Sequence, residues 1–322
     1  MADIVLRTVT GTHGATRAMK NGDVTPRGFA FEFEEVPGLI PAFRRMVRGL
    51  EFDVCEMAFT TYLCAKAFGK PFTALPVFPV RAFHHGAIVR GASSEARTPT
   101  DLEGRRVGVK RGYTVTTGVW ARGILQDEYG VDLSRVTWMP SGDEHVAEYR
   151  PPANVTPLAP GTDLEEQLTA GRLAAGIGIR ADHPGLEPLI PRPEEAGFDA
   201  LRSRGLYPIN HLVVVRDDLL AARPGLAADL FWAFAEAKRR YIERLSRDDA
   251  DTQGNTDTQG NADRMYRRVM AITGRDPLPY GIEPNRPMIE LLIRHAVSQR
   301  ILDAPGPAPE ALFAEGTRDM AA

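Results

Sequence analysis

Short apolar runs alternate with amphipathic stretches along the first third of the chain. The runs have strand length and are rich in Val, Ile, Leu and Phe, while the other stretches place apolar residues at helical spacing. The predicted strands are 4–9, 29–33, 52–57, 73–78 and 87–90, and the predicted helices are 16–20, 41–50 and 62–68. Strands and helices that alternate in this way predict an α/β lobe.

A second series of the same kind follows a polar, proline-containing segment at 93–101, which we interpret as a linker. Its predicted strands are 106–110, 136–139 and 174–179, and its predicted helices are 118–129 and 164–173. Asp163 is placed to cap the later helix, and Gly171 lies near its end. These elements predict a second βαβ lobe.

The chain is expected to cross back into the first lobe in its last third. Residues 212–215 are strongly β-forming, and residues 218–245 and 265–272 have helical patterns. Between these helices, residues 251–261 contain two copies of Asp-Thr-Gln-Gly-Asn, which predicts a solvated loop.

The predicted fold class is therefore α/β with two lobes. Residues 1–95 and 213–322 are expected to form the first, discontinuous lobe, and residues 96–212 the second. A ligand cleft is expected between them.

The composition restricts the classes of partner. The 322 residues are 43% hydrophobic and 25% charged, as in folded globular proteins, and no apolar run is long enough to span a bilayer. The formal net charge is only −3, so neither nucleic acid nor a membrane surface is an expected partner. A small molecule is the expected partner, and a homo-oligomer is compatible with the sequence.

Two features bear on the cellular compartment. The first residues show no basic segment followed by an apolar stretch, so we predict no secretory signal and a cytoplasmic location. Cys55 and Cys64 are the only cysteines, and we expect both to be reduced and buried, with neither a disulfide nor a metal.

Candidate site residues follow from the position of the loops. In open α/β sheets, ligands bind beyond the carboxyl ends of the strands. The segments that follow predicted strands are 11–16, 56–62, 79–85, 112–117 and 141–145. Polar side chains in these segments are the first candidates.

Arg81, His84 and His85 stand together just beyond a predicted strand. An arginine can hold a carboxylate through two parallel hydrogen bonds, and a histidine can donate or accept a proton near neutral pH. The set suits an acidic substrate that undergoes proton transfer. The alternative is that Arg81 forms a surface ion pair and that the two imidazoles point to opposite faces, as adjacent strand residues do.

Threonines precede or begin two predicted helices. Thr60 and Thr61 follow Glu56, and Thr114 and Thr116 precede a helix in the second lobe. Hydroxyls and free N–H groups at a helix N-terminus form an anion site. Ordinary N-capping is the alternative and the more common role of such threonines.

His211 and Arg286 are the later candidates. His211 lies at the predicted crossover and should face the cleft, whereas we expect His145, His183 and His295 to be surface or structural histidines. Arg286 stands near the start of a predicted helix, where ligand binding and attachment of that helix to the lobe are equally compatible with the sequence.

Five motifs occur in a fixed order along the chain. They are DVCEMAFTTYL at 53–63, LPVFPVRAFHH at 75–85, DLEGRRVGV at 101–109, YPINH at 207–211 and YGIEPNR at 280–286. Together they resemble the 4,5-dihydroxyphthalate decarboxylase family over nearly the whole chain. The resemblance implies a periplasmic-binding-protein type II fold used as an enzyme, which decarboxylates 4,5-dihydroxyphthalate or a related hydroxybenzoate without an organic cofactor. We assign no metal to the site.

Three positions depart from the family pattern. The family has an arginine where this chain has His84, a serine where it has Gly86, and Tyr-Asp where it has His13-Gly14. Histidine cannot replace the bidentate clamp of a guanidinium. The number of carboxylates on the substrate therefore stays open.

The chemistry of such a substrate assigns roles to the candidates. Direct loss of carbon dioxide would leave an aryl carbanion without delocalisation, so the ring must be protonated first. We expect Arg81 to hold the carboxylate and His85, or in second place His211, to deliver the proton.

A further group should pull on the phenolic hydrogen by accepting a hydrogen bond from the phenol. Glu56 or His84 is expected to accept the phenolic hydrogen bond, with Tyr62 as an orienting partner. The other expected substrate contacts are Thr60, Thr61, Thr114, Thr116 and Arg286.

Two other functions are left open by the sequence. A solute-binding protein would hold an aromatic acid reversibly without turnover, because a fold does not decide function. A metal bound by His84 and His85 could replace acid catalysis, although adjacent histidines on a strand are a poor chelating pair.

Overall fold

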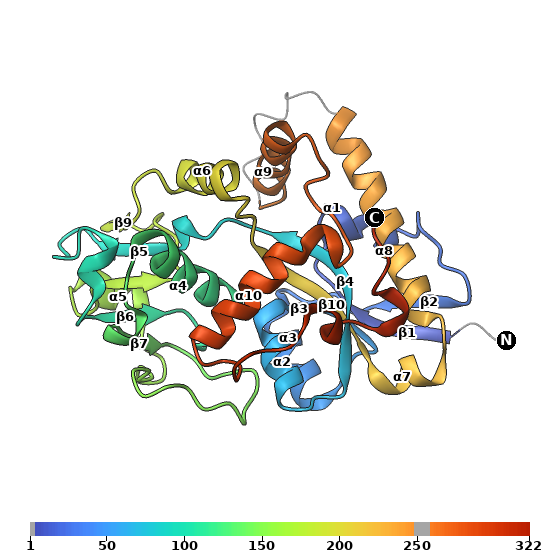
Figure 1. Cartoon of the computed structure of the whole chain (residues 1–322), viewed down its shortest axis with the longest axis horizontal. Coiled ribbons are helices and arrows are strands. Elements are labelled where there is room, and N and C mark those ends of the chain that lie inside the picture. The colour runs from blue at the N-terminus through green and yellow to red at the C-terminus, as the bar shows by residue number, and fades with distance from the viewer. Residues whose placement is uncertain (1–3, 248–257) are drawn as a thin grey trace.

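The structure, a computed structural model, describes residues 4–247 and 258–322. Two mixed five-stranded sheets lie side by side, each covered by helices (Figure 1). The predicted α/β class with two lobes is thereby confirmed. The chain leaves the first lobe after strand β4 and returns to it with strand β10.

The first lobe is built on the sheet β2-β1-β3-β10-β4. Its strands are β1 (Ile4–Val9), β2 (Phe29–Phe33), β3 (Val54–Ala58), β4 (Phe72–Arg81) and β10 (Ile209–Arg216). β1 is parallel to β2 and β3, whereas β10 runs antiparallel to β3 and β4. This direction brings the first residues of β10 to the carboxyl end of β3, where His211 pairs with Ala58.

The helices of the first lobe surround this sheet. They are α1 (Gly14–Lys20), α2 (Leu39–Gly49), α3 (Phe59–Ala67), α7 (Asp217–Ala222), α8 (Leu226–Arg247), α9 (Thr258–Thr273) and α10 (Arg286–Ser298). In Figure 1, α10 crosses the front of the molecule between the two sheets, and it contacts α3 of the first lobe and α4 of the second. The two lobes are therefore joined by packing as well as by the crossovers.

The second lobe is built on the sheet β7-β6-β8-β5-β9. Its strands are β5 (Ile88–Gly91), β6 (Arg106–Val109), β7 (Thr137–Pro140), β8 (Ala175–Ile177) and β9 (Leu186–Pro188), and its helices are α4 (Thr116–Tyr129), α5 (Leu164–Thr169) and α6 (Pro193–Arg204). The indole N–H of Trp120 on α4 donates to the carbonyl of Ile209 at 2.9 Å, which ties this lobe to the start of β10.

The sheets correct both lobe boundaries taken from the sequence. β5 pairs with β8 and β9 and belongs to the second sheet, so the outward crossover precedes residue 88 rather than residue 95. β10 already begins at Ile209, so the return crossover precedes the predicted position at 212. An apolar run fits either sheet equally well, and only the pairing partner decides to which sheet it belongs.

Other predictions on the late part of the chain have mixed outcomes. β9 and α6 form where the sequence pattern gave no element. The predicted loop at 251–261 lies mostly outside the described residues, and residues 258–261 belong to the first turn of α9.

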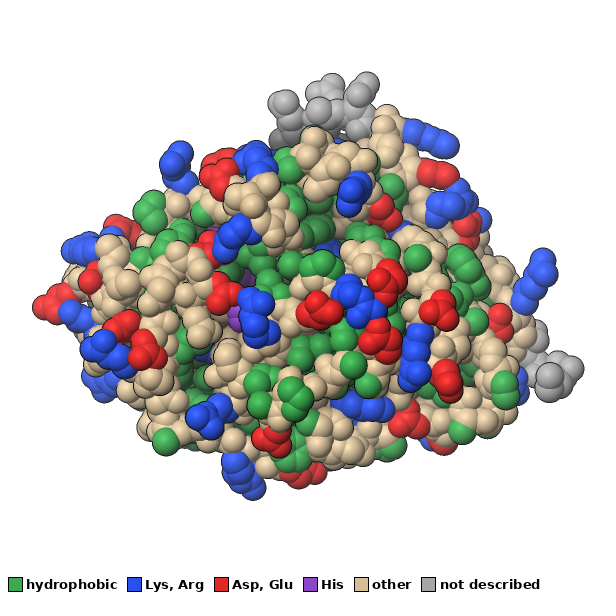
Figure 2. Space-filling view, viewed as in Figure 1, with side chains coloured by type: hydrophobic (Ala, Val, Ile, Leu, Met, Phe, Trp, Pro, Cys, Tyr) green, Lys and Arg blue, Asp and Glu red, His purple; other side chains and the backbone are tan. Residues whose placement is uncertain are grey.

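Charges of both signs are mixed on the face of the molecule that Figure 2 shows. Figure 2 shows Lys, Arg, Asp and Glu side chains interspersed over one face, without a large area of a single sign. Within residues 4–247 and 258–322, no helix combines the length and apolar character needed to cross a membrane.

Candidate functional site

A cavity of about 250 Å³ lies between the lobes at the carboxyl ends of several strands. Its apolar lining is Leu39, Ile40, Phe43, Ala58 and Val115, and its polar lining is Thr61, Arg111, Thr116, Thr117, His145, Asn210 and His211. Three of the segments expected to carry the site, 56–62, 112–117 and 141–145, contribute to this lining, whereas 79–85 does not.

A carboxylate shared by two imidazoles lies beside the cavity. Glu56 on β3 accepts from His211 Nδ1 at 2.7 Å through Oε1, and from His13 Nε2 at 3.2 Å and the Gly11 N–H at 2.8 Å through Oε2. His211 reaches Glu56 diagonally, because Val213 is the residue opposite Glu56 and side chains two apart on a strand share a face. The segment after β1 supplies the other two donors.

The charge of Glu56 follows from these contacts. Burial by itself would raise its pKa, but the charges and hydrogen bonds of His13 and His211 outweigh burial and hold the pKa of Glu56 well below its ordinary value. Glu56 is therefore ionised and accepts hydrogen bonds from both imidazoles. Glu56 is fully buried, while the side chains of His13 and His211 are 22% and 23% exposed.

His211 is the member of this network that lines the cavity. Glu56 occupies its Nδ1, and its Nε2 has no protein partner among the residues that the structure describes. The ring meets Phe43 of α2 edge to face with centroids 5.3 Å apart, which fixes the imidazole plane. One nitrogen held by a carboxylate and the other free toward a cavity is the arrangement of a general acid or base.

His13 depends on tight packing of the helix that follows it. A Cβ on Gly14 would lie 2.0 Å from a ring carbon of Tyr241 on α8. Glycine is therefore required where the family pattern has an acidic residue, because Tyr241 occupies the space. This close approach sets the position of His13 beside Glu56.

Another part of the lining forms where the N-termini of α3 and α4 meet. Thr60 donates its N–H to Thr116 Oγ1 at 3.1 Å and its hydroxyl to the carbonyl of Thr114 at 2.6 Å, which joins the two helix starts. Thr61 is buried and lines the cavity, and its hydroxyl has no hydrogen-bond partner in the described part of the chain. A free buried hydroxyl at a helix N-terminus is suited to an anion.

Arg111 adds a positive charge to this wall. It has a φ of 72°, in the left-handed region that L-residues with large side chains rarely adopt. Ser141 accepts its N–H at 3.0 Å, and Gly142 packs so closely that a Cβ there would lie 3.2 Å from the Arg111 Cα. Within the described ranges, the Arg111 guanidinium forms no ion pair or hydrogen bond, which leaves it available to an anionic ligand.

His84 acts on the cavity through Asn210. Burial lowers the pKa of His84 to about 4, so the imidazole is neutral, and its Nε2 lies 2.9 Å from Asn210 Oδ1. With His84 donating to that oxygen, the Asn210 amide group offers its N–H donors to the cavity that it lines. His84 is thus a positioning residue rather than the expected acceptor of a phenolic proton.

His145 was expected on the surface or in a structural role, and the structure excludes the surface position. It is buried and lines the cavity. Burial and the nearby positive charge of Arg44 lower its pKa to about 4, so the ring is neutral at physiological pH. Its Nδ1 has no hydrogen-bond partner among the described residues.

Arg81 and His85 do not line the cavity. Arg81 is buried against the Tyr207 ring and donates to the Tyr207 carbonyl at 2.8 Å and to Asn285 Oδ1. His85 is fully buried with its Nε2 3.1 Å from Glu128 on α4. The structure therefore does not bring Arg81 and His85 to the cavity that His211 lines, and it gives no support to their expected roles as substrate clamp and first proton donor.

Tyr62, Thr114 and Arg286 are also engaged elsewhere. The Tyr62 hydroxyl is buried and donates to the carbonyl of Leu312, far from the site in sequence. Thr114 donates its hydroxyl to Glu144 at 2.5 Å. Arg286 forms ion pairs with glutamates on the surface, Glu283, Glu290 and Glu310, so its structural alternative holds.

The residues that sequence reasoning missed are His13, Arg111, His145 and Asn210. His13 and His145 lie in loops that were marked as candidate segments, and Asn210 precedes His211 in the YPINH motif. Arg111 directly follows the predicted strand 106–110. All of them would have been found if every polar residue near a strand end, and not only clusters of polar residues, had been treated as a candidate.

The two adjacent histidines do not converge on a shared point. His84 contacts Asn210 and His85 contacts Glu128, which belong to different elements. Among residues 4–247 and 258–322, no group of three or more His, Cys, Asp or Glu side chains is arranged to hold a metal ion.

Comparison with known proteins gives two curated relatives. The chain is 30% identical over 306 residues to the 4,5-dihydroxyphthalate decarboxylase of Comamonas testosteroni, with 90% of each chain covered. It is 35% identical over 175 residues to the enzyme of the same name from Pseudomonas putida, covering 50% of this chain and 67% of that protein. No family model matches the chain.

Solved structures of distant sequence share the fold. The aliphatic sulphonate binding protein SsuA of Escherichia coli matches with a TM-score of 0.55 at 12% identity, over 99% of this chain and 100% of that one. The alkanesulfonate-binding protein SsuA of Xanthomonas axonopodis pv. citri matches with a TM-score of 0.52 at 14% identity, over 97% and 99%. The desulfurization enzyme DSZB matches with a TM-score of 0.56 at 14% identity, over 97% and 96%. The expected periplasmic-binding-protein fold is confirmed.

Proposed function

The chain belongs to the 4,5-dihydroxyphthalate decarboxylase family, and from this membership we propose that it decarboxylates a hydroxylated aromatic acid held between its lobes. The observation that carries the proposal is the buried Glu56 carboxylate shared by two imidazoles, one of which lines a cavity with a free guanidinium on its other side. Cavities of about 150 Å³ hold benzene. A volume of about 250 Å³ is therefore suited to one substituted ring.

The carboxylate of the substrate is assigned to the wall formed by α3 and α4. Arg111 supplies a fork of donors without a protein partner among the described residues, and the Thr61 hydroxyl and the first N–H groups of α4 supply further donors. The Asn210 amide completes a wall made of donors. Such a wall favours an anion over a neutral phenol.

His211 is proposed to protonate the ring carbon that carries the carboxylate. Its Nδ1 is held by Glu56, and the ring becomes a dienone-like intermediate when the ring carbon gains this proton and the phenolic oxygen loses its own to the acceptor. Carbon dioxide then departs: the electron pair of the broken C–C bond restores the aromatic ring as a phenolate, which takes its proton back from the acceptor. The net change consumes one proton, which His211 recovers from solvent.

The phenolic proton needs an acceptor, and His13 is the proposed one. Its Nε2 contacts the other oxygen of Glu56 at 3.2 Å, and its side chain is 22% exposed. His13 does not itself line the cavity, so this role requires a substrate hydroxyl that extends beyond the lining toward Glu56. Every step uses side chains of this chain, and we propose turnover without an organic cofactor.

The test is a panel of acids incubated with purified protein. 4,5-Dihydroxyphthalate, 3,4-dihydroxybenzoate, 4-hydroxybenzoate and benzoate are compared by carbon dioxide release and by ring absorbance. We expect release from at least one hydroxylated acid and none from benzoate, which lacks the electron-donating hydroxyl.

Binding of an acid in calorimetry without carbon dioxide release would favour the non-catalytic solute-binding protein instead. His211→Asn serves as the matched control in this assay. It preserves a donor to Glu56 but removes the titrating nitrogen.

A further inference from the structure

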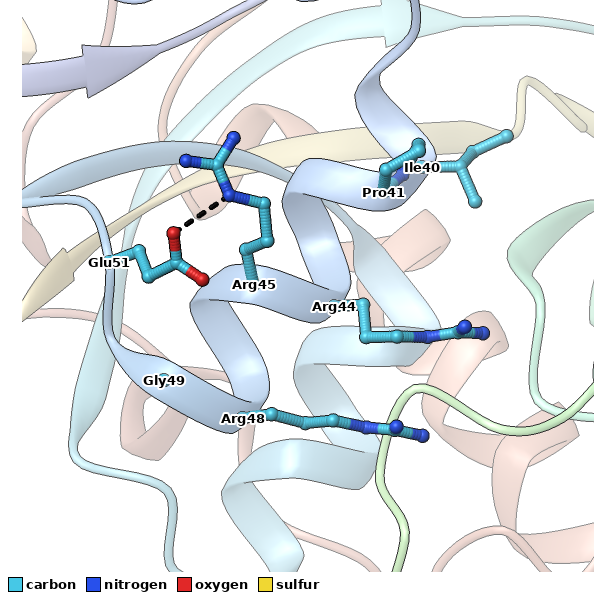
Figure 3. Close-up of a pocket in the computed structure, with 7 residues that line it drawn as sticks. All are labelled: Ile40, Pro41, Arg44, Arg45, Arg48, Gly49 and Glu51. Atoms are coloured by element: carbon cyan, nitrogen blue, oxygen red, sulfur yellow. Dashed lines mark hydrogen bonds and ion pairs between the residues drawn. The ribbon is translucent and has the colours of Figure 1, made fainter.

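Helix α2 carries three arginines with different partners. Arg45 is bonded within its own lobe, to Glu34 at 2.5 Å and to Glu51 at 2.8 Å. Arg44 and Arg48 extend together to another side of the helix, along a groove of about 500 Å³ (Figure 3). The second pair is directed at the other lobe.

Arg44 and Arg48 bind three successive residues that follow β7. Asp143 accepts from Arg44 at 2.7 Å and from Arg48 at 3.1 Å. Arg48 also donates to the carbonyl of Glu144 at 2.7 Å and to that of His145 at 3.1 Å. One helix of the first lobe therefore holds a short segment of the second.

This segment is connected directly to the cavity. His145 lines the cavity, and its ring lies 6.2 Å from the Phe43 ring between centroids. The Glu144 carboxylate accepts from the Thr114 N–H at 3.1 Å and hydroxyl at 2.5 Å, just before α4 begins. A shift of the segment would move both His145 and the wall assigned to the substrate carboxylate.

The charges on α2 favour contact between the lobes. Arg44 and Arg48 are four residues apart, and like charges at this spacing repel on a helix surface. Asp143 relieves this repulsion only when the lobes are together. The pairs with Asp143 are well exposed and screened by salt, so the hydrogen bonds from Arg48 to two carbonyls are the stronger part of the contact.

We propose that Arg44, Arg48 and residues 143–145 form an interlobe latch that holds the cleft closed and positions His145 and the start of α4. Arg44 and Arg48 do not line the cavity, so they act as positioning residues. The latch itself stands on these contacts, and only its kinetic test rests on the proposed function.

The test compares Arg44→Met/Arg48→Met with Arg45→Met, which removes a charge from the same helix without touching the other lobe. X-ray scattering of the ligand-free proteins reports closure. We expect the double variant to have a larger radius of gyration than the wild type, and Arg45→Met to match the wild type. With a substrate accepted by the wild type, the double variant should raise KM about tenfold and change kcat by less than about threefold.

High salt provides a further discriminating measurement: it should raise the KM of the wild type by a larger factor than that of the double variant, in which the latch is already absent and only the contacts with the anionic substrate remain to be screened. Equal radii of gyration for the double variant and the wild type would overturn the latch, as would the same expansion in Arg45→Met. If no acid is turned over, the proposed function fails, while the scattering comparison still decides on the latch.

Discussion

Two histidine–glutamate pairs occupy opposite environments in this protein. In the pair His211–Glu56 the carboxylate is fully buried and the imidazole is 23% exposed at a cavity. In the pair His85–Glu128 the imidazole is fully buried and the carboxylate is 12% exposed, with a second partner in Arg204 at 2.6 Å. Both pairs have a short N···O contact, but only the first leaves an imidazole nitrogen facing space for a ligand.

The difference teaches that a carboxylate contact alone does not mark a catalytic histidine. What matters is whether the second nitrogen faces a cavity. Glu128 also satisfies an arginine and holds α4 beside the crossover, which is a structural task. Glu56 has no basic partner other than the two imidazoles among the described residues, so its charge is directed at the cleft.

Removing the buried charge should have the largest effect on activity. Glu56→Gln leaves the side-chain shape but removes the charged acceptor that holds and orients His13 and His211, so we expect kcat/KM to fall by about 10³. Glu128→Gln should lower it by less than about threefold. Carbon dioxide release under identical conditions measures both, and comparable losses in the two variants would erase the distinction between the pairs.

The same carboxylate gives a stability signature with a definite sign. Because the pKa of Glu56 is depressed in the folded protein, its contribution to the free energy of unfolding is complete above its ordinary value of 4.5 and is lost as pH falls through the folded-state value. Urea unfolding should show the wild type losing its advantage over Glu56→Gln below about pH 4.5. If the stability advantage of the wild type over Glu56→Gln grows as the pH falls, the depressed pKa assigned to Glu56 is wrong.

The histidines themselves give the next largest contrast. His211→Asn should lower kcat by about 10² to 10³, since general acid catalysis contributes factors of this size. His85→Asn should retain turnover within about threefold and lose about 1–3 kcal/mol of unfolding free energy, because a buried partner of Glu128 changes. Steady-state kinetics paired with denaturant melts measure both quantities. If His85→Asn is inactive but as stable as the wild type, His85 is the proton donor and the prediction is wrong.

Arg111 and Arg81 can be compared in the same way, because Arg111 lines the cavity and Arg81 does not. Arg111→Met should raise KM by about 30-fold with a smaller change in kcat, because it removes a charge-assisted contact made with bound acid. Arg81→Met should instead destabilise the fold, since buried carbonyl and amide partners lose their donor. Initial rates over a range of substrate concentration separate the two. A rise in KM confined to Arg81→Met would return the clamp to Arg81.

The smallest effect concerns a residue one step removed from the cavity. His84→Leu should raise KM by about threefold to tenfold, because the Asn210 amide loses the donor that orients it. His84→Gln supplies an N–H donor of similar reach and should restore most of the loss. The rescue is the informative measurement, since equal KM values in the two variants would mean that His84 does not orient Asn210.

Much of the architecture could be read from local pattern. The alternation of strand-length apolar runs and helical stretches predicted two α/β lobes, and the loops after three strands were correctly marked as lining the cleft. His211 was correctly placed at the crossover facing that cleft. These inferences succeeded because side-chain periodicity and strand direction depend on neighbours in the sequence.

The sequence by itself also supplied the family, through motifs that keep their order along the chain. Only the tertiary structure decided which candidates are free for a ligand. Arg81 is hydrogen-bonded to Tyr207 and Asn285, 126 and 204 residues away, and Glu56 meets His211 across 155 residues. A polar side chain bonds whatever the folded chain places beside it, and partners so distant leave no periodic signal near either residue. The sequence around a residue therefore indicates which chemistry its side chain can perform. The whole fold decides whether that side chain is free to contact a ligand.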